Sequence, residues 1–106
     1  MITIEDFAKL ELKVAVILEA KAHPDADRLL VLIVDTGTEK KEIVAGISQH
    51  YKPEELVGKK VILVNNLQPA TLRGVVSNGM ILAAKDGERL SLVVPERPVA
   101  PGATVR

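Results

Sequence analysis

The sequence predicts an all-β fold, a small five-stranded Greek-key barrel with short helices and a C-terminal extension. Val, Ile, Leu and Ala supply nearly all of the apolar content, and Phe7 and Tyr51 are the only aromatic residues. Branched aliphatic residues fit a pleated, half-buried surface better than a helix. Segments with strand character also follow the order strand, strand, strand, short helix, strand, strand, which is the order of that barrel.

Length and composition indicate one folded domain over residues 1–106. A chain of 106 residues can bury roughly two-thirds of its unfolded surface but is too short for a second core. Hydrophobic residues make up 47% and charged residues 26%, which is ordinary for a globular protein. The absence of cysteine excludes disulfides and thiolate metal sites.

The N-terminal third predicts a helix followed by two strands. Thr3 is a suitable N-cap for a helix of about two turns over residues 3–10, whose apolar side would pack on a barrel or on a second subunit. Residues 12–19 alternate with period two, as a strand does. Residues 23–27 have turn composition, and residues 29–34 form a strand that is apolar on both faces, which indicates barrel closure or a dimer contact.

The remaining elements are shorter. A hairpin near Gly37 leads to a strand at 43–45, and Pro53 with two following acids begins a short helix that Gly58 ends. Further strands are expected at 59–64, 72–76, 80–84 and 90–94. The proline-rich residues 95–106 suit an edge segment or an extended arm.

Charge is balanced overall but not along the chain. The 14 basic and 14 acidic residues cancel, which counts against simple electrostatic capture of nucleic acid. Residues 1–51 hold nine acidic and six basic side chains, whereas residues 56–85 hold no acidic one and four basic ones, Lys59, Lys60, Arg73 and Lys85. A local positive face is therefore expected there.

No catalytic or metal motif is present, so neither an enzyme nor a cofactor is expected. The sequence has no nucleophile motif, phosphate loop or zinc-ligand spacing. His23, Asp25 and Asp27 could suggest a metal or acid–base cluster, but Pro24 and Ala26 favour a turn in which Asp caps backbone N–H groups. The N-terminus lacks a signal-like stretch, and we expect a soluble cytoplasmic protein without membrane association.

Several short blocks follow one another along the chain in a recognisable order. The most telling are residues 23–29 (HPDADRL) and 43–47 (IVAGI). The others are residues 6–9 (DFAK), 11–14 (ELKV), 51–59 (YKPEELVGK), 66–69 (NLQP), 72–74 (LRG) and 77–80 (SNGM). Together these blocks resemble one family, the tRNA-binding domain found at the C-terminus of bacterial methionyl-tRNA synthetases, in a free-standing dimeric protein and in cytokine-like polypeptides.

This resemblance implies an OB-fold, the oligonucleotide-binding form of the Greek-key barrel, and structure-specific tRNA binding at the outer corner of the L-shaped molecule. It also implies a homodimer, and either a free-standing protein or the C-terminal appendage of a methionyl-tRNA synthetase catalytic chain. A chaperone branch shares the fold, so a dimeric protein-binding or peptide-binding module is the alternative. Peptide binding would be insensitive to salt, whereas RNA binding would weaken steeply with salt.

The candidate tRNA-binding residues are Lys9, Lys13, Asn66, Arg73, Ser77, Gly79 and Met80. The Ser77 hydroxyl could bond phosphate or ribose, Gly79 would allow close backbone approach, and Met80 could pack on a base. The alternative for this block is an Asn-Gly turn with a core methionine.

Arg73, Lys9 and Lys13 could contact phosphate, although each residue type more often lies free on a surface. Asn66 could bond a base edge or a 2′-hydroxyl, or its own backbone. We expect the region around Arg73 and Met80 to form an exposed, cation-bearing groove lip. With so few aromatic residues for base stacking, recognition should depend on shape, backbone and ribose.

Overall fold

Long antiparallel strands form the first half of the molecule, which the computed structural model describes over residues 1–106. β1 (Leu12–His23), β2 (Ala26–Asp35) and β3 (Lys40–Ala45) pair in sequence as a meander. β1 pairs with β2 at Ile17 and Val34, and β2 pairs with β3 at Leu32 and Ile43. The predicted three-strand meander is confirmed.

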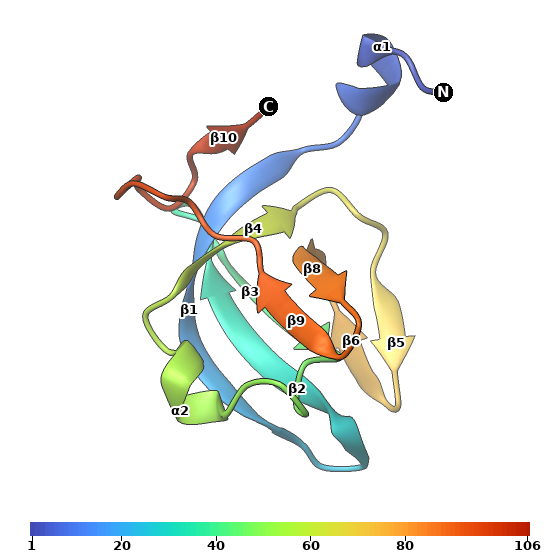
Figure 1. Cartoon of the computed structure of the whole chain (residues 1–106), viewed down its shortest axis with the longest axis vertical. Helices are drawn as coiled ribbons and strands as arrows, with labels where there is room; N and C mark the ends of the chain where they lie inside the picture. The colour runs from blue at the N-terminus through green and yellow to red at the C-terminus, as the bar shows by residue number, and fades with distance from the viewer.

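The second half returns to the free edge of β1. α2 (Pro53–Leu56) leads into β4 (Lys60–Val64), which pairs with β1, and β7 (Met80–Ile81) pairs with β4. The resulting order is β3-β2-β1-β4-β7, and β10 (Thr104–Val105) adds to the start of β1. Figure 1 shows β1 curving along the whole barrel, with the C-terminal tail crossing its upper end. The expected edge role of the tail is confirmed for β10.

Two small hairpins complete the chain. β5 (Ala70–Leu72) pairs with β6 (Val75–Ser77), and β8 (Ala83–Asp86) pairs with β9 (Arg89–Leu92). The prediction of one strand over 72–76 was wrong, because Arg73 (φ 51°) and Gly74 (φ 90°) form the two-residue turn that reverses the chain. The predicted strand 80–84 is likewise divided at Leu82 between β7 and β8.

The barrel closes where the ends of the sheet meet. The Asn78 backbone N–H donates a hydrogen bond to the Glu42 carbonyl at 2.9 Å. The Val44 backbone N–H donates to the Ser77 Oγ, also at 2.9 Å. The Asn78 side-chain amide also donates to the Glu42 carbonyl, at 3.5 Å. One backbone bond and two side-chain bonds therefore connect β3 to the end of β6 and the residue that follows it.

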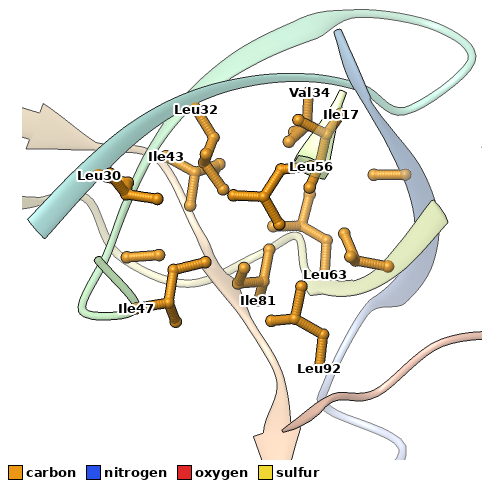
Figure 2. Close-up of a cluster of buried hydrophobic side chains, with 13 residues drawn as sticks. Ile17, Leu30, Leu32, Val34, Ile43, Ile47, Leu56, Leu63, Ile81 and Leu92 are labelled. Atoms are coloured by element: carbon orange, nitrogen blue, oxygen red, sulfur yellow. The ribbon is translucent and has the colours of Figure 1, made fainter. Parts of the chain in front are cut away.

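The interior holds thirteen buried aliphatic side chains from all parts of the barrel. Figure 2 shows Leu32, Ile43, Leu63 and Ile81 converging from β2, β3, β4 and β7. Leu56 of α2 is fully buried in the same cluster. The helix between β3 and β4 thus covers one end of the barrel. A helix this short is not stable alone, so the packing of Leu56 in the core holds it in place.

A second, smaller cluster lies on the outer face of β1 and β4. Leu12, Val14, Ile62 and Val64 are buried there beneath Phe7, Leu82, Ala103 and Val105. Because residues on a strand alternate between faces, β1 is apolar on both sides at this point. The C-terminal tail is therefore part of the fold.

α1 (Ile4–Phe7) has only one turn, so the predicted two-turn helix was wrong in length. Thr3 and Asp6 form a capping box at its start. The Lys9 N–H bonds to the Asp6 carbonyl and the Leu10 N–H to the Phe7 carbonyl, a tightening that ends the helix. Phe7 packs on the outer cluster, as expected. Ile4 and Leu10 are exposed and do not pack on the barrel, so for these two residues packing on a second subunit stays a prediction. With four residues each, α1 and α2 lack the length and apolar character that a membrane span requires.

Candidate functional site

An apolar groove of about 310 Å³ lies between the end of β3 and the segment from Leu67 to Met80. Leu67 and Leu72 form part of its wall, with Met80 and residues 44–47 around them. None of the thirteen lining residues is charged. The predicted groove near Met80 therefore exists, but its lining carries no cation.

Ser77 lies in the groove wall and is 4% exposed. Its hydroxyl accepts from the Val44 N–H and donates to the Gly79 carbonyl, both at 2.9 Å. The hydroxyl that was expected to bond phosphate or ribose is thus engaged inside the protein. We assign Ser77 a structural role in closing the barrel, and this corrects the expected direct contact.

Gly79 is buried for a packing reason. Its φ is 150°, and a Cβ atom at this position would lie 2.9 Å from the Val64 carbonyl oxygen and 3.1 Å from a Leu63 methyl carbon. Glycine is therefore required so that β7 can approach β4. The close approach that Gly79 allows in this structure is to Val64 and Leu63 of β4, and a close approach of its backbone to RNA stays a prediction.

Met80 and Arg73 are the exposed members of the predicted set on this side of the barrel. Met80 is 47% exposed at the groove edge, so the alternative of a core methionine was wrong. Arg73 is exposed at the tip of the β5–β6 hairpin. At the rise of a strand, this tip lies roughly 10 Å from Ser77. The cation therefore lies at the end of the groove, beyond Leu72.

Lys9, Lys13 and Asn66 lie together near the start of β1. The Asn66 side-chain amide accepts from the Glu11 N–H and donates to the Lys9 carbonyl, each at 2.8 Å. Asn66 thus holds the segment between α1 and β1 to the end of β4. The alternative that Asn66 bonds its own backbone was wrong, because both partners lie in the distant segment before β1. The Lys9 ammonium is 3.5 Å from the Asp6 carboxylate and stays 80% exposed, whereas Lys13 lies 4.0 Å from Glu11 and is 28% exposed.

The His23–Asp25 turn is organised by the histidine. Asp25 donates its backbone N–H to His23 Nδ1 at 2.9 Å, and His23 Nε2 lies 3.0 Å from the Leu72 carbonyl. The expected turn is present, but the histidine makes the cap that was assigned to aspartate. No group of three or more His, Asp or Glu side chains could hold a metal ion.

The predicted residues therefore fall into two groups. Ser77, Gly79 and Met80 line the groove, with Arg73 at the hairpin tip beyond it, and Lys9, Lys13 and Asn66 lie beside α1. Leu67 and Leu72 were not among the predicted site residues, although they are 43% and 37% exposed in the groove wall. Isolated leucines in a sequence are indistinguishable from core residues. Their presence in the blocks at 66–69 and 72–74 was the signal that could have identified them.

Comparison with known proteins covers nearly the whole chain. The family model described as "Putative tRNA binding domain" matches residues 12–104. The methionine–tRNA ligase of Thermotoga maritima is 54% identical over 104 residues, a match that covers 98% of this chain. The chain spans only 16% of the length of that ligase.

Two solved structures have the same fold over the full chain. The MetRS-related protein from Pyrococcus horikoshii superposes with a TM-score of 0.94 at 36% identity, covering 100% of this chain and 98% of that one. The CsaA chaperone protein from Picrophilus torridus superposes with a TM-score of 0.92 at 30% identity, covering 100% of both chains.

Proposed function

Since the chain belongs to the tRNA-binding domain family, we propose that it binds folded tRNA through the exposed side of residues 65–81 and the neighbouring lysines. The observation that carries the proposal is the family match over residues 12–104. In the ligases the chain corresponds to a non-catalytic tRNA-binding region. The chain contributes affinity and no chemistry.

In this proposal the basic side chains contact phosphate, and the groove edge contacts a sugar or base. Arg73 contacts backbone phosphate from the hairpin tip, and Lys9 adds a second contact beside α1. Met80 packs against a sugar or base at the groove edge. No acidic residue interrupts residues 56–85, so this side repels the RNA backbone less than the acidic N-terminal half does.

Neither aromatic side chain is available as a stacking platform. Phe7 packs on the outer cluster, and the Tyr51 hydroxyl accepts a hydrogen bond from the Leu92 N–H at 3.1 Å. Proteins that bind single strands without sequence preference stack successive bases on aromatic rings. The lack of such a surface favours recognition of folded RNA by its shape and backbone.

The partner proposed for the domain is a methionyl-tRNA synthetase catalytic chain in the cytoplasm, joined covalently or bound in trans. A tethered tRNA-binding domain raises the effective concentration of tRNA near the catalytic site without contributing to catalysis. The similarity to a methionine–tRNA ligase and to a MetRS-related protein supports this arrangement.

A homodimer is the proposed assembly. Ile4 and Leu10 near α1 are 75% and 45% exposed, and Val93, Val94 and Val99 of the tail are also exposed. Apolar side chains gathered at the chain ends are typical of surfaces that meet a second copy. Sedimentation velocity at micromolar concentration should give a dimer mass that Ile4→Glu reduces to the monomer mass. A monomeric parent chain would contradict the proposed assembly.

Gel-shift titration with bulk tRNA, a single-stranded RNA and a duplex RNA tests the proposed specificity. We expect the tightest binding to tRNA, with affinity that falls as salt is raised. Equal binding to all three RNAs, or to none, would contradict structure-specific recognition.

A chaperone-like peptide-binding module is the second candidate. The uncharged groove and the similarity to the CsaA chaperone protein favour it, because an apolar peptide side chain could enter such a groove. Peptide binding of this kind would not change with salt. A salt titration with labelled tRNA and a labelled apolar peptide therefore separates the two candidates.

A further inference from the structure

The β5–β6 hairpin is a separate two-stranded sheet, and Ser77 at its base accepts a hydrogen bond from β3. All three residues of β5 are exposed, and Val76 of β6 is 45% exposed. The hydrogen bond from His23 to the Leu72 carbonyl connects the tip of this hairpin to the turn between β1 and β2. Leu72 lies in the groove wall and is 37% exposed, and the His23 bond to its carbonyl is the hydrogen bond that attaches this end of the hairpin to the barrel.

The surroundings of His23 fix the role of each ring nitrogen. Because Nδ1 accepts the Asp25 N–H at 2.9 Å, it carries no proton, so Nε2 bears the hydrogen of the neutral ring. Nε2 then donates to the Leu72 carbonyl at 3.0 Å. The residue is 5% exposed, so water cannot easily replace either bond.

The Leu72 carbonyl belongs to the peptide unit that leads into Arg73. A peptide unit is planar, so a hydrogen bond that fixes the Leu72 C=O also fixes the direction of the Arg73 N–Cα bond. Arg73 is the only residue other than glycine with positive φ, at 51°. Positive φ is unfavourable for a residue with a side chain, so it persists only where the surrounding structure fixes the backbone. Residues in such conformations often lie at functional sites.

We infer that His23 is a positioning residue for tRNA binding, which holds the left-handed turn so that the Arg73 guanidinium projects toward RNA phosphate. The inference rests on the proposed function of Arg73. His23 itself does not touch the RNA.

A double-mutant cycle in the full chain tests the inference with labelled tRNA. The amide nitrogen of glutamine can take the place of His23 Nε2, whereas that of asparagine corresponds to Nδ1 and cannot reach the Leu72 carbonyl. We expect Arg73→Ala to weaken binding roughly tenfold, as loss of a charge-assisted phosphate contact does. His23→Asn should weaken it roughly fivefold in the parent, and less than twofold beside Arg73→Ala. His23→Gln should stay within about twofold of the parent.

Two results would overturn the inference. In one, His23→Asn weakens binding by the same factor with and without Arg73, which indicates a general loss of folding. In the other, His23→Asn leaves the parent affinity unchanged. Lys9→Ala paired with His23→Asn is the control, with effects expected to multiply. If Arg73→Ala alone leaves affinity unchanged, the proposed role of Arg73 fails, and this outcome is distinct from the first two.

Discussion

At the residue scale, Ser77 and Arg73 have opposite roles although both lie in the same short segment. Ser77 is buried with its hydroxyl satisfied by Val44 and Gly79, so it stabilises the barrel. Arg73 is exposed in a backbone conformation that disfavours its side chain. Ser77 therefore stabilises the fold, and Arg73 is the residue of this segment that we propose contacts RNA.

Ser77→Ala should lower the free energy of unfolding by about 2 kcal/mol, because the buried Val44 N–H loses its acceptor. The tRNA affinity of the folded variant should remain within about twofold of the parent. Chemical denaturation and a tRNA titration measure the two quantities. Ser91→Ala is the matched control, since Ser91 is exposed and should change neither. A large affinity loss at unchanged stability would show that the Ser77 hydroxyl contacts RNA.

Arg73→Asn should raise the free energy of unfolding by roughly 0.5–1 kcal/mol while weakening tRNA binding. Asparagine tolerates positive φ, and Asn-Gly is the preferred sequence of this hairpin turn. Thermal unfolding measures the expected gain in stability, and tRNA titration measures the expected loss of affinity. Arg97→Asn, at another exposed position, should not stabilise the fold. A loss of stability in Arg73→Asn would mean that the arginine side chain makes contacts that outweigh its backbone cost.

At the element scale, the close contact of β7 with β4 depends on Gly79. Val64 pairs with Met80 across these strands, and the space beside Gly79 is filled by the Val64 carbonyl and the Leu63 side chain. The same contact sets the position of Met80 at the groove edge.

Gly79→Ala should destabilise the fold by about 3 kcal/mol, because positive φ and a steric clash both oppose the methyl group. Gly87→Ala is the control, since Gly87 has φ 60° but a Cβ atom added there would have no other atom within 4 Å. The free energy of unfolding of Gly87→Ala should fall by only about 1 kcal/mol, because positive φ opposes the methyl group but no steric clash does. Denaturant unfolding measures both, and equal losses would contradict a packing role for Gly79.

At the scale of the whole molecule, the order of strands could be predicted from the sequence, whereas the contacts that build the site could not. The alternation in residues 12–19 and the boundaries of the helix at Pro53 are local signals. The bonds of Ser77 to Val44 and of Asn66 to Lys9 join residues far apart in sequence, so no local pattern encodes them. The hairpin at Arg73 escaped prediction because Arg-Gly is not the usual turn pair.

Nuclease footprinting of folded tRNA tests most directly whether this face binds tRNA by its shape. We expect protection of one continuous region at the outer corner, where the arms of the L meet. Protection should weaken with Arg73→Ala and remain with Ser91→Ala at equal protein concentration. Protection scattered over the whole tRNA, or protection unchanged by Arg73→Ala, would contradict recognition through this face.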